Sequence, residues 1–251
     1  MADERTGRVE PGVSVGLNED HGLAAQSEEW MRTASDPSLV EDGALGLLKE
    51  AGLSGAILET LSKNKKLMKS RKVRVAVVGH PKTPRHVSVP AVRQLYTFDL
   101  MNVALSPVVP ADVKMAAEET LIVKVDSISQ GERLTLARRA SGRVAAALLT
   151  DLEERIVRAA LENGRLTEAL VAAAVACADV PAHTVVAVCE HPKWSLRQEV
   201  RLALLRNEKT PVSKAVEFAR GLPRGLLREV LLESRMAVEV KERLTAEVDA
   251  G

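Results

Sequence analysis

The sequence predicts an all-α protein built from repeated helices, and two observations carry this prediction. Apolar residues make up 46% of the 251 residues while aromatic residues make up only 2%, so Leu, Val and Ala must form the core. Leu and Ala are strong helix formers. In addition, apolar runs end again and again at short polar breaks, two of which, at His191-Pro192 and at Asn207-Glu208, lie between Pro181 and Pro211. We therefore expect a series of helices with essentially no β-sheet.

Composition excludes several classes of protein. The net charge is +1, so no overall field draws the chain to nucleic acid or to an anionic membrane. The two cysteines, Cys177 and Cys189, are too few for a disulfide framework, which indicates a reducing compartment. No apolar segment follows the first residues as in a secretory signal, and no run of 18 apolar residues suggests a membrane span. We expect a cytoplasmic protein that does not enter a membrane.

Residues 1–42 are predicted to form a disordered acidic tail, because glycines, prolines and acidic residues are scattered through them without a helical period. Trp30 stands out in this polar segment. It is either an anchor that docks a partner or a side chain that packs back on its own domain, and the second alternative is the more common one.

Residues 43–72 are predicted to form N-terminal cap helices followed by a basic linker. Apolar residues recur with helical spacing over 43–61, but Gly52 and Gly55 interrupt the period. This pattern indicates either two short helices or one weak helix.

Charge changes sign abruptly near residue 60. Residues 1–60 hold 12 acidic and 4 basic residues, a net charge of −8, whereas residues 61–100 hold 10 basic and 1 acidic residue, a net charge of +9. A basic block lies at Lys63, Lys65, Lys66, Lys69, Arg71, Lys72 and Arg74. It is either a patch for phosphates or an acidic partner, or a solvated face that the acidic segment neutralises. The second alternative is favoured, because no aromatic residues for base stacking are interleaved. We also expect the acidic segment to cover the block loosely and to weaken the access of anionic ligands.

Residues 73–247 are predicted to form the repeat array. Helices should stop near residues 80, 106, 141, 163, 191, 207 and 234, and an alanine stands four residues before five of these stops: Ala76, Ala137, Ala159, Ala187 and Ala203. Helix starts are marked by capping residues or by Thr before Pro at Thr83, Ser129, Asp151, Ser195 and Thr210. The best-matched stops, Asn163 and Asn207, lie 44 residues apart, close to the length of a two-helix repeat.

Three segments, 73–84, 156–165 and 200–211, carry a resemblance to the HEAT-like superfamily, most closely to the bacterial leucine-rich-repeat-variant type. The resemblance covers about residues 70–245 and implies a right-handed α-solenoid of degenerate HEAT-like repeats, with roughly nine to twelve helices over 43–247. Members of that superfamily mostly serve as interaction scaffolds. The variant type can hold an iron–sulfur cluster on N-terminal cysteines, but no cysteine precedes Cys177, so this property is not carried over.

Candidate chemistry is sparse. Cys177, His183, Cys189 and His191 form the one group of metal-ligand side chains, but their spacing lacks the short pairing of zinc sites. No phosphate-binding loop motif is present. We therefore expect no enzyme, no metal and no cofactor. Trp194 either packs on the first turn of a helix starting at Ser195 or lines a binding groove, and the first alternative is favoured.

The sequence favours a non-enzymatic protein–protein interaction scaffold that binds another protein of unknown identity. The alternative is a nucleic-acid-binding HEAT-like protein that uses the basic block. Acidic and basic residues balance from residue 101 onward, with 21 of each, so an ion-paired surface is more plausible there than a nucleic-acid face.

Overall fold

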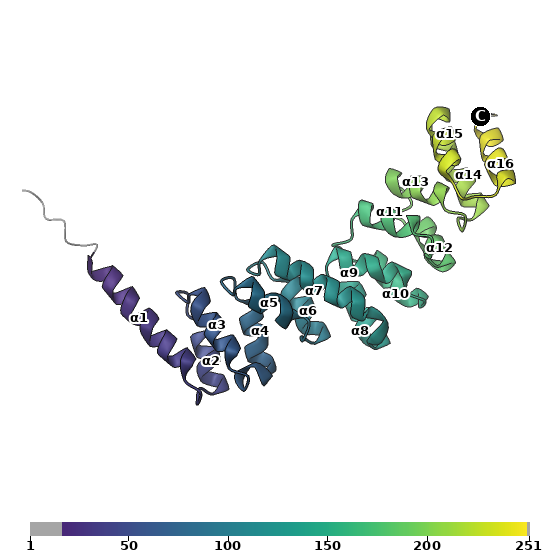
Figure 1. The fold of residues 1–251 in the computed structure, drawn as a ribbon. Helices are drawn as coiled ribbons and strands as arrows, with labels where there is room; N and C mark the ends of the chain where they lie inside the picture. Colours follow the sequence, from purple (N-terminus) through teal and green to yellow (C-terminus); the bar gives the residue numbers. More distant parts are fainter. Residues whose placement is uncertain (1–16, 250–251) are drawn as a thin grey trace, which may run out of the picture. The chain divides into compact units, whose positions relative to one another are not determined.

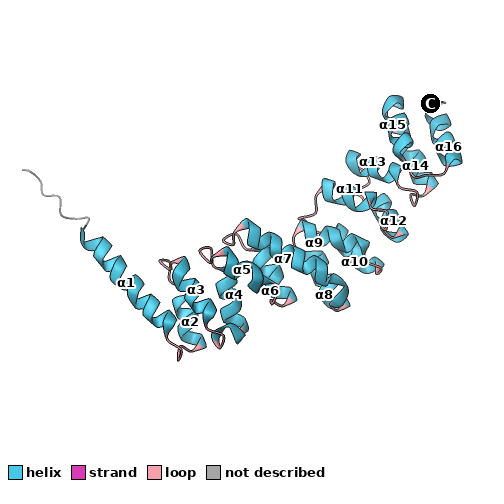
Figure 2. Cartoon of the chain, in the orientation of Figure 1, coloured by secondary structure: helices cyan, strands magenta, loops and turns pink. Residues whose placement is uncertain are grey.

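The computed structural model describes residues 17–249, which contain 16 α-helices and three 3-10 helices and no β-strand. Figure 2 shows short loops between successive helices. The prediction of an all-α protein is therefore confirmed. The helices fall into two compact units, residues 1–91 and residues 92–251, and each is considered by itself below.

The first unit contains α1 to α5. The bounds are α1 Leu17–Ser35, α2 Glu41–Leu47, α3 Gly55–Lys63, the 3-10 helix η1 Leu67–Lys69, α4 Arg71–Gly79 and α5 Arg85–Val92, which ends one residue beyond the unit (Figure 1). Its core is built from aliphatic side chains, among them Ala44, Leu53, Ile57, Leu61 and Val77, all fully buried. Of the two alternatives for residues 43–61, two short helices are present, as α2 and α3.

The prediction of a disordered tail over 1–42 is wrong for the part that the structure describes, since α1 and the start of α2 lie within it. Trp30, Met31 and Ala34 follow one another at helical spacing and form an apolar face. This face packs with α3, and Ala34 is only 2% exposed. Three apolar residues were too few to reveal a period in the sequence. Residues 1–16 lie outside the described part of the chain.

The second unit contains the remaining helices, most of them short. The bounds are α6 Thr97–Leu105, α7 Ala111–Lys124, η2 Val125–Ser127, α8 Gln130–Arg139, α9 Gly142–Ala147, η3 Leu148–Thr150, α10 Glu154–Leu161, α11 Glu168–Ala176, α12 Ala182–Glu190, α13 Gln198–Arg206, α14 Val212–Arg220, α15 Arg224–Glu233 and α16 Val238–Asp249. From residue 41 onward the described chain has 15 α-helices, more than the nine to twelve expected. The helices are short, 6 to 14 residues each, and breaks of only a few residues separate them. The apolar period continues across such breaks, so the sequence predicts fewer helices than the structure contains.

Helices pack mainly against the helix two places along the chain. In the first unit α1 packs on α3 and α2 on α4. In the second unit one series runs α7, α9, α11, α13, α15, and contacts of the same kind join α8 to α10, α10 to α12 and α14 to α16. Hydrogen bonds between such helices, or the turns that follow them, join residues about 23 to 35 apart, as in Arg143 to Glu118 and Trp194 to Leu161. The structural period is therefore two helices in about 30 residues.

The 44-residue period inferred from Asn163 and Asn207 is wrong, because three helices, α11, α12 and α13, lie between these two residues. The two asparagines nevertheless act alike. Asn163 Nδ2 donates to the carbonyls of Ala137 and Ala140 at the end of α8, and Asn207 Nδ2 donates to the carbonyl of Val175 near the end of α11. Each satisfies carbonyls that the end of a helix leaves unpaired, two helices back. The same device serves helices of both series, which explains the misleading spacing.

Basic side chains reinforce these helix ends. The Lys209 ammonium donates to the carbonyls of Ala178 and Val180 after α11, at 3.2 and 2.7 Å. Lys124 donates in the same way to Arg93 and Leu95 after α5, at 3.3 and 3.1 Å. A cation beside a helix C-terminus is favourable, because the carbonyls carry partial negative charge there.

The predicted helix boundaries are partly confirmed. His80, Ser106, His191, Asn207 and Ser234 each directly follow the last residue of a helix, and Asn163 follows Leu161 by two residues. Ser141 likewise follows Arg139, the last residue of α8, by two residues, and it directly precedes the start of α9.

The predicted helix starts are also only partly confirmed. Ser129 and Glu132 form the expected capping box. Thr83 and Thr210 instead donate their hydroxyls back to the carbonyls of Val77 and Leu204 in the preceding helix, at 2.5 and 2.6 Å. Both threonines are buried, so these bonds help to close the turn.

Candidate functional site

Three residues of the basic block, Lys63, Lys72 and Arg74, have polar partners within the first unit. Lys63 ends α3, where its ammonium lies 2.9 Å from Glu59 Oε1, and the Lys72 ammonium in α4 lies 3.5 Å from Glu41 Oε1. Arg74 uses Nε and Nη2 to bind the carbonyl of Met68, at 3.0 and 2.7 Å. The charges of Lys63 and Lys72 are thus partly neutralised, although both side chains remain exposed.

The block's remaining lysines lie on the surface. Lys65, Lys66 and Lys69, in the turn after α3 and in η1, are exposed and form no ion pair with any residue between 17 and 249. Arg71, in the first turn of α4, is exposed and has a polar partner. The chemistry available to a polyanion is thus concentrated in three lysines.

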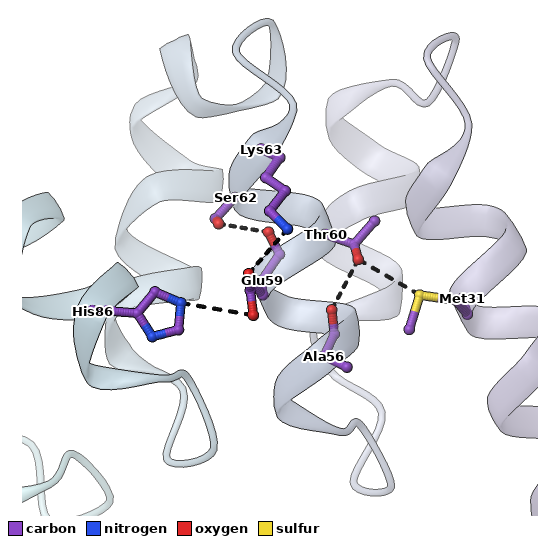
Figure 3. A network of polar contacts seen from close by, with 7 residues as sticks. All are labelled: Met31, Ala56, Glu59, Thr60, Ser62, Lys63 and His86. Atoms are coloured by element: carbon purple, nitrogen blue, oxygen red, sulfur yellow. Dashed lines mark hydrogen bonds and ion pairs between the residues drawn. The ribbon is translucent and has the colours of Figure 1, made fainter.

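Figure 3 shows Glu59 between Lys63 and His86. Its Oε1 faces Lys63, and its Oε2 lies 3.6 Å from His86 Nε2. The hydrogen bond from Lys63 lowers the pKa of Glu59 below its ordinary value, with help from the charge of that lysine. Neutralisation of the block thus comes partly from α2 and α3. A flexible cover formed by residues 17–35 is contradicted, because these residues form α1 and pack on α3.

Trp30 packs back on its own unit, as the favoured alternative states. Its ring lies against the core of the first unit, and a Cβ atom added at Gly52 would come within 2.8 Å of it. Close contact with a glycine backbone leaves this face of the indole covered. Beside it, the Thr60 hydroxyl donates to the Ala56 carbonyl at 2.9 Å and lies 3.6 Å from Met31 Sδ (Figure 3).

Both interpretations of Trp194 are wrong. The residue is 1% exposed, and its Nε1 donates to the carbonyl of Leu161, the last residue of α10, at 2.8 Å. Lys193 covers the ring with its ammonium 3.9 Å from the centroid. The next helix begins at Gln198 instead of Ser195. Trp194 therefore closes the end of α10 from two helices away and lines no groove.

The cysteine and histidine group is dispersed. Cys177 is exposed, whereas Cys189 is buried, and burial raises the pKa of its thiol to about 12. His183 Nε2 lies 3.0 Å from the carbonyl oxygen of Asp151. His191 Nδ1 accepts from the backbone N–H groups of Lys193 and Trp194, at 3.2 and 3.4 Å. Within the described residues no three His, Cys, Asp or Glu side chains are grouped to hold a metal.

A groove in the second unit was not anticipated from the sequence. A hollow of about 550 Å³ lies between α8 and α10, and a smaller one of about 210 Å³ lies between α10 and α12. Both are lined by Arg158 and Glu162, so they adjoin. We call the two hollows together the α10 groove. The first contains Arg138, Glu154, Arg155, Arg158, Ala159 and Glu162; the second contains Arg158, Leu161, Glu162, Ala187, Glu190, His191 and Pro192.

A second hollow surface lies between α15 and α16, with a volume of about 720 Å³. Its lining includes Leu231, Leu232 and Val238, of which Leu232 is 84% exposed. Lys241, on the same wall, donates to the carbonyl of Ser234 at 2.6 Å. This surface is predominantly apolar, whereas the α10 groove is charged.

Comparison with known proteins finds no match: no protein family, no curated protein and no solved structure is similar to the chain. None of the helices between residues 17 and 249 has the length and apolar character needed to cross a bilayer.

Proposed function

We propose that the protein is a non-enzymatic interaction scaffold with the architecture of a right-handed α-solenoid of degenerate HEAT-like repeats. The packing of most helices on the helix two places along supports this architecture, because stacked helix pairs produce that pattern of contacts. The two free cysteines fit a reducing compartment, and we place the protein in the cytoplasm.

The proposal rests on the buried polar side chains, which form hydrogen bonds to backbone carbonyls. Asn163, Asn207 and Thr210 are at most 6% exposed, and each donates to a carbonyl at the end of a helix. Thr184 does the same for the carbonyl of Leu149 in η3. These groups hold repeats together and are committed to the backbone. The chemistry that remains accessible is a charged, grooved surface, which suits recognition of another protein.

Affinity capture from the protein's own cells, followed by reconstitution with the purified partner, tests this function. We expect a stoichiometric complex that survives nuclease treatment and forms from the purified components. Turnover of a substrate by the isolated chain, or capture that depends wholly on nucleic acid, would contradict the scaffold proposal.

A nucleic-acid-binding function is the second candidate, and the exposure of Lys65, Lys66 and Lys69 favours it. Three phosphate contacts would give an affinity that falls with salt concentration, with a slope of log K on log salt of about −2 to −3. Mobility-shift assays at salt concentrations from about 50 to 200 mM measure this slope. Substitution of the three lysines by glutamine is expected to abolish the salt dependence. Binding that the substitution leaves intact would exclude this surface.

A further inference from the structure

We propose that the α10 groove binds an acidic segment of a partner protein through Arg138 and Arg155. The proposal rests on the scaffold function above and assigns to it a site and a class of ligand. The groove lies wholly within the second unit, on three helices that pack in succession, α8, α10 and α12.

Small side chains hollow out the groove. Ala159 and Ala187 each stand four residues before a helix stop, and both contribute to its lining. A larger side chain at either position would fill space that is now open to a ligand. Buried aliphatic neighbours, Val157, Ala160 and Val188, fix α10 and α12 from behind. The alanine pattern in the sequence therefore has a second consequence here, which is a concave surface between neighbouring helices.

The charges of the groove are partly satisfied and partly available. Arg158 is engaged, because its Nε and Nη2 bind Glu154 Oε1 at 2.8 and 2.7 Å. Arg138 and Arg155 are exposed and make no ion pair with any residue that the structure describes. A guanidinium presents a planar pair of donors that matches a carboxylate, and a charge-assisted pair of this kind is among the stronger polar contacts. Two such groups at one hollow favour a ligand with closely spaced carboxylates.

His191 adds a donor to the second hollow. Because its Nδ1 accepts two backbone N–H groups, the proton of the neutral ring resides on Nε2. That atom is buried, lacks a hydrogen-bond partner and lies 3.3 Å from Glu162 Oε1. A ligand carboxylate that displaces the exposed Glu162 side chain would meet this N–H.

The acidic residues of the groove select a peptide over a nucleic acid. Glu154, Glu162 and Glu190 line the same surface as the arginines. A nucleic-acid strand carries a phosphate at every step and would place charge against these carboxylates. A peptide can instead carry acidic side chains opposite the arginines and neutral or basic ones opposite the glutamates.

The test uses the full chain with Lys65, Lys66 and Lys69 replaced by glutamine, so that binding to the first unit is suppressed. A fluorescein-labelled octapeptide in which glutamate alternates with alanine is the probe, and anisotropy measures its affinity. Arg138→Glu with Arg155→Glu is expected to weaken binding about tenfold or more. Arg139→Glu is the matched control, because Arg139 is the next residue on α8, is also exposed and lies outside the groove lining. It is expected to change affinity less than about twofold.

Three results would overturn the proposal: unchanged affinity in the double variant, an equal loss with Arg139→Glu, or tighter binding of an eight-residue oligothymidylate through the same two arginines. Thermal unfolding of each variant checks the fold. If the double variant unfolds, hydrogen exchange on the parent chain decides, with protection of α8 and α10 by the peptide expected and its absence contradicting the site. A captured partner that still binds the double variant would refute the groove while leaving the scaffold function standing.

Discussion

At the scale of single residues, one small set of polar groups recurs at helix ends. The side chain that follows a helix accepts a backbone N–H two residues on: Asn163 from Arg165 and Asn207 from Lys209, both at 2.8 Å, and His80 from Lys82 at 3.2 Å. Asparagine and neutral histidine are interchangeable as acceptors in this role. Only asparagine also donates, through its amide, to the helix two places back.

We predict that Asn163→Ala destabilises the second unit by about 1–3 kcal/mol, because the carbonyls of Ala137 and Ala140 lose a buried donor. Asn163→Asp keeps the acceptor for Arg165 but sets a carboxylate against the same carbonyls. It should therefore be at least as destabilising at neutral pH and recover partly in acid. Urea unfolding at pH 7 and pH 4.5, roughly either side of a raised carboxyl pKa, measures both effects. Asn102→Ala, on an exposed position of α6, is the control and should change little.

The second residue-scale prediction concerns pH. Burial lowers the pKa of His80 below 6.5, its ordinary value, and the nearby Lys82 charge adds to the effect. The unfolded chain therefore takes up the proton more readily than the folded chain. The contribution of neutral His80 to stability is full above pH 6.5 and is lost as pH falls through that value toward the lower folded pKa.

His80→Asn supplies an acceptor that does not titrate, so we expect this variant to lose part of the decline in stability between neutral and mildly acidic pH. Urea midpoints measured across that interval test the prediction. Parallel pH profiles for the parent and His80→Asn would show that His80 does not contribute to it.

At the scale of elements, the sequence predicts those helix boundaries that depend on residues adjacent in the chain. It does not predict the boundaries that depend on packing between distant residues. Ser129 and Ser195 begin similar motifs, yet only Ser129 forms a capping box. Trp194 must reach the carbonyl of Leu161, and burying its ring holds the following residues in a turn, so that α13 starts at Gln198. An N-cap side chain stabilises a helix by about 1 kcal/mol, which is less than the free energy gained by burying an indole ring.

The α10 groove could not be predicted from the sequence either, because packing between distant residues forms it. Its arginines and alanines are visible in the sequence, but their union depends on α8, α10 and α12 being successive neighbours. That arrangement requires the two-helix period, which the spacing of Asn163 and Asn207 concealed. The basic block, in contrast, was visible because its residues are clustered in the sequence, although the pairing of Lys72 in α4 with Glu41 in α2 depends on packing and could not be foreseen.

The prediction at the scale of elements concerns Gly142, the first residue of α9, and its effect on stability. A Cβ atom at Gly142 would overlap the carbonyl oxygen of Arg165 and come within 3.2 Å of Leu170 Cδ1. Because backbone cannot move aside as a flexible side chain can, Gly142→Ala should destabilise the second unit by about 1–3 kcal/mol or more. Gly164→Ala, next to Arg165 in sequence, meets no atom within 4 Å and is the control. Thermal melts of the two variants compare them, and equal melting temperatures would show that the backbone approach is looser than the structure indicates.

At the scale of the whole molecule, the chain is organised by contacts between near neighbours. Hydrogen bonds between neighbouring helices or their ends connect residues about 23 to 35 apart in both units, and the buried core consists mainly of aliphatic side chains. In the repeat array that we propose, stability is approximately the sum of contributions from repeats and their interfaces. Different parts of the chain therefore need not unfold together.

The two tryptophans allow this to be measured, since Trp30 lies in the first unit and Trp194 in the second. In Trp194→Phe the remaining indole reports the first unit, and in Trp30→Phe it reports the second, so each substitution alters the unit that is not observed. We expect two distinct urea midpoints. The first unit should unfold at the lower concentration, because α1 to α5 offer fewer stacked interfaces than α6 to α16. Circular dichroism of the parent chain, which contains both units intact, should then show a broad or two-step loss of helix. Coincident midpoints in both variants and a single sharp transition in the parent would mean that the two units fold as one cooperative body.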